Sequence, residues 1–109
     1  MSTTFDDLFT AAEQAWAPRV IDVRTMALAR QSSRLADALA ALAAVGVRCR
    51  LFDVVPPEPA MPLLKAEAFV DGDLTGAVRP YSRGSEDSRI EAMRLLADDL
   101  EQLAFDCVP

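Results

Sequence analysis

The chain of 109 residues contains no histidine and only one lysine, Lys65. It therefore lacks the most common general base and the most common metal ligand, which argues against histidine-based catalysis and against a zinc site. Its two cysteines lie far apart in the sequence and form no CxxC motif, so both are expected to be reduced. The sequence predicts no catalytic residue, no metal and no cofactor.

Long hydrophobic runs are missing as well. No apolar run approaches the roughly 18 residues that a transmembrane helix requires, and residues 1–16 carry acids but no base, unlike a signal peptide. These absences predict a chain that does not enter a membrane and that resides in the cytoplasm. Because 51% of the residues are hydrophobic, one domain spanning residues 1–109 is expected to fold without disulfides.

The charge is acidic and unevenly distributed. The net charge is −6, with three acids and no base in residues 1–18 and seven acids against two arginines in residues 86–109. An acidic chain is not attracted to nucleic acid by its charge, but it can be attracted to a basic surface on another protein. The sequence therefore favours a protein partner over a nucleic acid.

Residues 20–55 are expected to contain the centre of the fold. Apolar and β-branched residues alternate with charged ones in residues 20–26, a period typical of a strand. Leucines then recur with helical spacing at Leu35, Leu39 and Leu42, on a backbone of strong helix formers. A second alternating run covers residues 47–55. Strand, helix and strand joined this closely predict a βαβ unit with two parallel strands.

The ends of the central helix have their own signals. Ser32 or Ser33 can accept a hydrogen bond from an unpaired backbone N–H in the first turn. Gly46 stands where the helix should end, and glycine adopts the left-handed conformation of a helix C-terminus without steric cost.

The flanking segments complete the predicted order. An amphipathic helix is expected over residues 4–16, and four of the seven prolines in residues 56–62 indicate a stiff connector. Residues 63–80 alternate around Asp71-Gly72, a dipeptide typical of a two-residue hairpin turn. A last helix is expected to begin after Ser85 or Ser88 and to continue to about residue 105.

This order resembles the thioredoxin-like fold, in which a strand–helix–strand half is followed by a proline, an antiparallel hairpin and a closing helix. Here the proline is Pro62, the hairpin turn lies in residues 69–76 and the closing helix in residues 85–105. The resemblance implies a single α/β domain with a βαβ unit, a hairpin, a C-terminal helix and an extra N-terminal helix. The family's paired cysteines follow the first strand, but residues 26–31 contain none. The resemblance therefore implies a binding protein without redox chemistry.

A second resemblance is to anti-sigma-factor antagonists, in which a strand precedes a loop that contains a serine, followed by a helix. Residues 21–23 followed by Gln31-Ser32-Ser33 are similar to that arrangement. This resemblance implies a regulatory domain.

Two groups of residues are candidates for binding. Arg79, Tyr81 and Arg83 precede a predicted helix N-terminus, where a phosphate or carboxylate can be held. On the last helix, acids predicted to face water could meet a basic partner; these are Asp98, Asp99 and Glu101.

The leading hypothesis is a non-enzymatic, small acidic binding module that docks on another protein as a regulator, inhibitor or assembly factor. One alternative is a thiol protein that uses Cys49 or Cys107 with a partner's cysteine. Another is a homodimer formed through a sheet edge near Val78 or through the helix that carries Phe5, Phe9 and Trp16.

Overall fold

The computed structural model describes residues 23–107, in which helices and strands combine into an α/β domain. The predicted helix over residues 4–16 lies outside the described residues. In chain order the elements are α2 (Val23–Ala29), α3 (Ser33–Ala44), β1 (Cys49–Val54), β2 (Leu63–Val70), β3 (Asp73–Pro80) and α4 (Glu86–Asp106).

The three strands form one antiparallel sheet in the order β1-β2-β3. The predicted hairpin is confirmed: β2 and β3 pair from Leu63 opposite Pro80 to Val70 opposite Asp73. Asp71 and Gly72 connect them with φ angles of 52° and 84°. Positive φ at both central residues defines the hairpin turn that matches the twist of the flanking strands. The DG dipeptide was therefore a reliable local signal.

The two longer helices also follow their local signals. Ser32 is the N-cap of α3, and its hydroxyl accepts a hydrogen bond from the Leu35 backbone N–H at 3.3 Å. Gly46 follows α3 with a φ of +79°, as predicted for the helix end. For α4 the cap is Ser85, which accepts from the Ser88 N–H at 3.2 Å. Ser88 instead accepts from the backbone N–H of Ser82 at 2.9 Å.

The strand predicted for residues 20–26 is wrong over residues 23–26, which belong to helix α2. The buried side chains of α2 are Thr25, Leu28 and Ala29, a spacing of three and four residues that fits a helix. In so short a window, alternation and helical spacing cannot be separated. The described sheet is wholly antiparallel, so the predicted βαβ unit is not confirmed.

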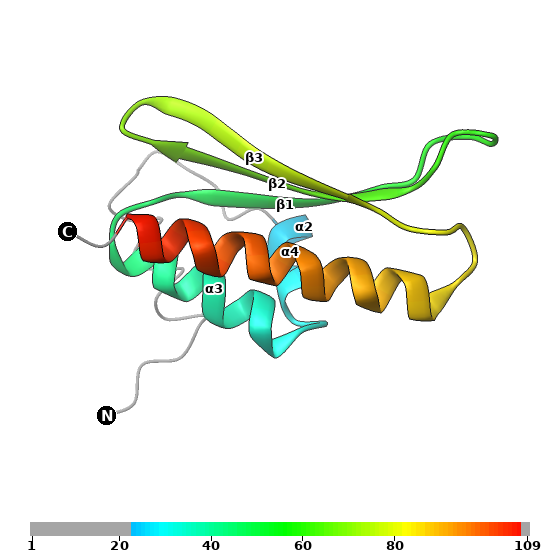
Figure 1. The fold of residues 1–109 in the computed structure, drawn as a ribbon, viewed down its shortest axis with the longest axis horizontal. Coiled ribbons are helices and arrows are strands. Elements are labelled where there is room, and N and C mark those ends of the chain that lie inside the picture. The colour runs from blue at the N-terminus through cyan, green and yellow to red at the C-terminus, as the bar shows by residue number, and fades with distance from the viewer. Residues whose placement is uncertain (1–22, 108–109) are drawn as a thin grey trace.

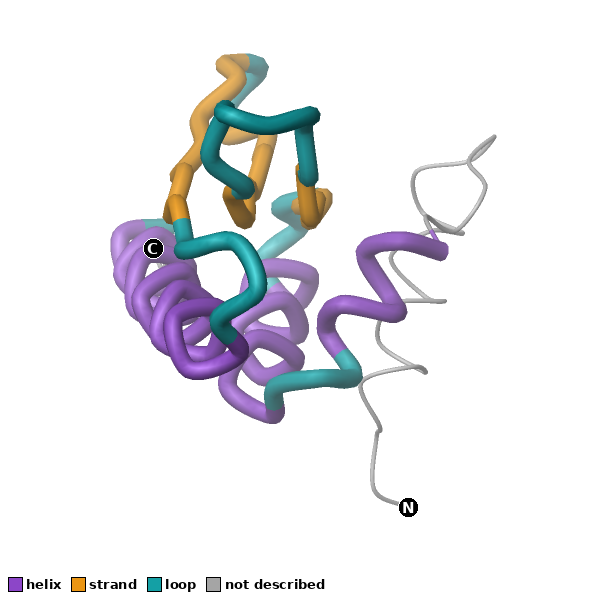
Figure 2. The backbone as a smooth tube through the Cα atoms, turned by 90° about the vertical axis from the view of Figure 1, so that its right-hand side faces the viewer, coloured by secondary structure: helices purple, strands orange, loops and turns teal. Residues whose placement is uncertain are grey.

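The sheet and the helices form two layers. Figure 1 shows α3 and α4 lying side by side beneath the sheet, with α2 behind them near β1. Viewed end-on in Figure 2, all described helices lie below or beside the strands, and the opposite face of the sheet carries no described element. The core between the layers contains five fully buried leucines, which are Leu35, Leu42, Leu51, Leu64 and Leu96.

Helix α2 closes the outer edge of β1 through a single side chain. The hydroxyl of Thr25 accepts from the Leu51 backbone N–H at 2.9 Å and donates to the Leu51 carbonyl oxygen at 3.4 Å. Thr25 and Leu51 are both fully buried, so water cannot substitute for either hydrogen bond. In the described chain, a helix therefore occupies the side of β1 that the sequence assigned to a parallel strand.

Candidate interaction surface

Five of the six predicted binding residues form ion pairs within the described chain. Arg79 of β3 donates from Nε and Nη2 to the two carboxylate oxygens of Asp99, at 2.8 and 2.7 Å. This fork geometry matches a guanidinium to a carboxylate and fixes α4 beneath β3. The Arg79 pKa is raised, chiefly by its hydrogen bonds to Asp99. Asp99 is thereby neutralised within the chain, whereas the Nη1 group of Arg79 takes no part in this pair.

Asp98 and Glu101 bind an arginine on the neighbouring helix. Arg34 of α3 donates from Nη2 to both oxygens of Glu101, at 2.9 and 2.8 Å, and also contacts Asp98. The hydrogen bond from Arg34 lowers the pKa of Asp98. These side chains are more than 40% exposed, so solvent screening keeps their contribution to stability small. Their role in the described chain is to hold α3 against α4.

Tyr81 lies in a polar cluster at one end of the sheet. Tyr81 is buried, and its hydroxyl donates to Asp53 Oδ1 at 2.6 Å. Asp53 Oδ2 accepts from Arg89 Nη2 at 2.8 Å. Burial and the neighbouring Asp53 carboxylate raise the Tyr81 pKa. Arg89 also donates to the side-chain oxygen of Gln31 at 2.7 Å. The cluster thus joins β1, α4 and the segment between α2 and α3.

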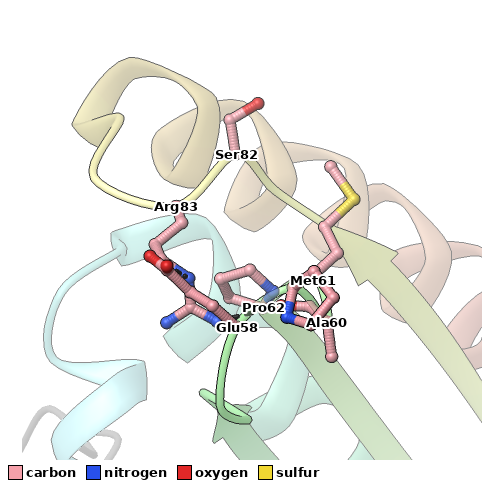
Figure 3. A pocket seen from close by; sticks show the side chains of 7 residues that line it. Glu58, Ala60, Met61, Pro62, Ser82 and Arg83 are labelled. Carbon is pink, nitrogen blue, oxygen red and sulfur yellow. Dashed lines mark hydrogen bonds and ion pairs between the residues drawn. The ribbon is translucent and has the colours of Figure 1, made fainter.

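Arg83 holds the proline connector in place. Its Nη2 donates to the backbone oxygens of Pro56 and Ala60, at 2.6 and 2.9 Å. Figure 3 shows Arg83 extending from its loop toward the connector, where Glu58 lies 3.6 Å from its Nε. A hollow of about 440 Å³ lies here, lined mostly by connector residues. Because two carbonyl oxygens and a carboxylate surround Arg83, the hollow offers little to an anion.

The structure therefore divides the predicted site residues between two places. Arg79 and Asp99 join β3 to α4, and Asp98 and Glu101 join α4 to α3. Tyr81 and Arg83 lie in the loop before α4. Sequence reasoning found charged residues that organise the fold, but their partners could not be read from local patterns.

The open face of the sheet was not expected as a site from the sequence, which indicated only a sheet edge near Val78 as a homodimer contact. Side chains on this face alternate with the buried ones, and three large apolar residues remain about half exposed: Phe69 at 48%, Leu74 at 59% and Val78 at 49%. Phe69 and Leu74 are directly opposite each other in the register. A contiguous exposed apolar patch on a small domain is typical of a contact surface. The sequence signal for this surface was the presence of apolar residues on both faces of the predicted hairpin, because only one face can be buried against the helices.

Basic side chains border this apolar patch. The Arg48 guanidinium lies 5.6 Å from the centre of the Phe69 ring, a favourable cation–π distance. Lys65 pairs with Glu67 at 2.8 Å on the same face. A hollow of about 410 Å³ lies between Arg48, Arg50, Glu67, Phe69 and Leu74. The open face is thus apolar with a basic margin, on a chain whose net charge is −6.

The outer edge of β3 completes this surface. The Leu51 backbone points toward Thr25 and away from β2, so Leu51 and Ala66 are a non-hydrogen-bonded pair. The N–H and C=O groups of Ala66 therefore point away from β1 and toward β3, where they pair with Ala77. The direction of these groups alternates from one residue to the next along each strand. The N–H and C=O groups of Leu74, Gly76 and Val78 therefore point outward.

Within the described chain, β3 contacts only β2 and α4. Helix α4 lies on the inner side of the sheet, beneath β3 (Figure 2). No described element therefore covers the outward backbone groups of β3. An edge strand with unpaired N–H and C=O groups is a template for pairing with another strand.

Other chemistry has little support among residues 23–107. This part of the chain contains no cluster of cysteine or acidic side chains suited to a metal ion. Burial raises the pKa of the Cys49 thiol to about 12, which leaves very little of the nucleophilic thiolate near neutral pH. Cys107 is half-buried near the C-terminus. None of the helices in this range combines the length and apolarity needed to cross a bilayer.

Comparison of the chain with protein-family models, with curated proteins and with solved structures finds no match.

Proposed function

We propose that this chain is a non-enzymatic binding module that docks on another protein through the open sheet face and the outer edge of β3. We call these two regions together the docking surface, defined by Arg48, Arg50, Phe69, Leu74, Gly76 and Val78. The observation that carries the proposal is the outward-pointing backbone of β3 beside half-exposed Leu74 and Val78. Unpaired strand backbone supplies affinity when a second strand is added, and neighbouring side chains supply specificity.

The overall negative charge of the chain favours the approach of a partner with a basic surface. The net charge of −6 attracts such a partner over several ångströms, whereas the docking contact itself is mostly apolar. In this role the chain would act in the cytoplasm as a regulator, inhibitor or assembly factor. For such a basic partner, raising the salt concentration is expected to slow association more than it speeds dissociation.

A thiol mechanism is a weaker proposal. Cys49 is only 6% exposed and the pKa of its thiol is raised, so it cannot readily attack a partner's disulfide. A distant relationship to thioredoxin-like proteins stays a prediction and carries no part of the docking proposal.

The test is affinity capture from the native host with the full chain as bait. We compare the wild type, the double variant L74K/V78K and the control variant I90K, and quantify captured proteins by mass spectrometry. Ile90 is 53% exposed on α4, so the control adds a lysine at a similarly exposed apolar position away from the docking surface.

The expected result is a partner that the wild type and I90K retain equally and that L74K/V78K loses by at least about tenfold, since charges on an edge strand oppose strand addition. Partners retained equally by all three baits would contradict the proposed function.

A further inference from the structure

We propose that the occupant of the β3 edge is a second copy of this chain, paired antiparallel across a two-fold axis at Gly76. The two three-stranded sheets would then join into one of six strands. This inference rests on the proposed function, because it names the occupant of the same docking surface. A second copy carries the same net charge of −6, so attraction to a basic partner plays no part in this pairing. A symmetric contact requires the edge to be complementary to itself, and the sequence of β3 meets that requirement.

The backbone of β3 fits this register. With Gly76 on the axis, Leu74 lies opposite Val78 of the second copy, and Gly76 lies opposite Gly76 of the second copy. Leu74, Gly76 and Val78 are the residues whose N–H and C=O groups point outward, so each facing pair can exchange two hydrogen bonds. All three outward residues are thereby satisfied at once.

Other symmetric registers satisfy fewer groups. Moving the axis to Val78 places Gly76 opposite Pro80, which has no backbone N–H to donate. Moving it to Leu74 places Gly76 opposite Gly72, so the tight Asp71-Gly72 turn would have to act as a strand. Pro80 at one end of β3 and the turn at the other therefore favour the register centred on Gly76 over these two.

Side chains on both faces agree with this register. On the open face, Leu74 and Val78, which are 59% and 49% exposed, would cover each other twice across the axis. On the inner face, Asp73 would lie opposite Arg79 of the second copy. Asp73 has no ion pair within the described chain, and Arg79 uses only Nε and Nη2 to bind Asp99. Opposite charges directly across neighbouring strands stabilise their pairing.

Glycine on the axis also fits. A Cβ atom at Gly76 would lie 2.6 Å from the backbone oxygen of Ala66, so the hairpin itself tolerates no side chain there. At the axis, the two glycines would approach with no side chain between them.

The test uses the full chain and two double variants that differ in charge pattern. In L74K/V78K the introduced lysines face each other across both symmetric pairs. In L74E/V78K each introduced glutamate faces an introduced lysine of the other copy. Sedimentation velocity over a range of chain concentrations measures the dimer dissociation constant for both variants, the wild type and I90K.

We expect the wild type and I90K to dimerise as concentration rises, and L74K/V78K to dimerise at least about 100-fold more weakly, because like charges meet in two places. The L74E/V78K variant is expected to recover most of that loss. Circular dichroism checks that each variant is folded, and an unfolded L74K/V78K is replaced by the single variant V78K, for which weakened dimerisation is again expected.

Three results would overturn the inference: a wild type that stays monomeric, a dimer that L74K/V78K does not weaken, or no recovery in L74E/V78K. The first would leave the edge to a different protein, and the second would place the contact elsewhere. If the wild type is monomeric and L74K/V78K still loses the captured partner, the second copy is ruled out as the occupant, but the proposed function stands. If L74K/V78K weakens the dimer but captures the same proteins as the wild type, the proposed function is ruled out, but the dimer inference stands.

Discussion

Replacing Thr25 with valine is expected to lower the free energy of unfolding by about 2–4 kcal/mol, since each buried backbone group left without a partner costs about 1–3 kcal/mol. Valine has nearly the shape of threonine, so packing in α2 is retained. The change removes the hydroxyl that serves both the N–H and the C=O of Leu51 at the fully buried edge of β1. Urea denaturation followed by circular dichroism, at one fixed chain concentration, measures the effect.

The control is Thr75→Val, which makes the same chemical change at an exposed position in β3. Its effect is expected to stay within about 0.5 kcal/mol, as for most surface substitutions. A T25V variant as stable as the wild type would contradict the account in which α2 closes this edge. That closure matters for function, because it leaves β3 as the open edge of the described sheet.

Replacing Gly76 with alanine is expected to destabilise the chain by about 2 kcal/mol, in the range found for overpacked sites. The added Cβ would lie 2.6 Å from the Ala66 backbone oxygen, which cannot move without disturbing the Ala66–Ala77 pairing. Besides lower stability, we expect faster amide hydrogen exchange at Ala77 when exchange is followed by NMR.

The comparison is with Gly72→Ala in the hairpin turn. A Cβ at Gly72 meets no atom within 4 Å, but the φ of +84° is unfavourable for alanine, at a cost of roughly 1–2 kcal/mol. G72A should therefore leave amide exchange in the middle of β3 unchanged. A G76A variant with wild-type stability and unchanged exchange at Ala77 would show that β2 and β3 do not approach closely at Gly76.

Elements with strong local signals could be predicted from the sequence. Helix α3 has a serine cap, a leucine repeat and a terminal glycine, and the hairpin has its Asp71-Gly72 turn. Each of these signals acts within a few residues, so one sequence is sufficient to find it. Helix α4 was predicted in the same way, although its cap remained open between Ser85 and Ser88.

The sheet topology could not be predicted in that way. Strand pairing joins residues far apart in sequence, and the expected parallel strand was assigned from seven residues, of which 23–26 are helical. The sequence signal for a helix here was the spacing of Thr25 three residues before Leu28 and four before Ala29, all of which are buried. Local patterns cannot reveal that this threonine bonds the backbone of Leu51, 26 residues later.

The binding roles expected from the sequence stay predictions, and the structure gives the charged residues partners within the chain. Arg79 was expected to hold an anion with Tyr81 and Arg83, but it binds Asp99. Asp98 and Glu101 were expected to meet a basic partner, but within the chain they bind Arg34. Which charges neutralise each other depends on the packing of α3, α4 and β3. The docking surface, in contrast, depends on apolar residues that are unusual only once the open face of the sheet is known.

Amide hydrogen exchange at the edge of β3, followed by NMR at low and high chain concentration, tests the central claim most directly. We predict rapid exchange at Leu74, Gly76 and Val78 in dilute solution and marked slowing as the concentration rises. The Leu51 amide, bound to Thr25, should exchange slowly at every concentration and serves as the internal reference. Exchange at the three edge amides that is slow in dilute solution, or that does not change with concentration, would contradict the account.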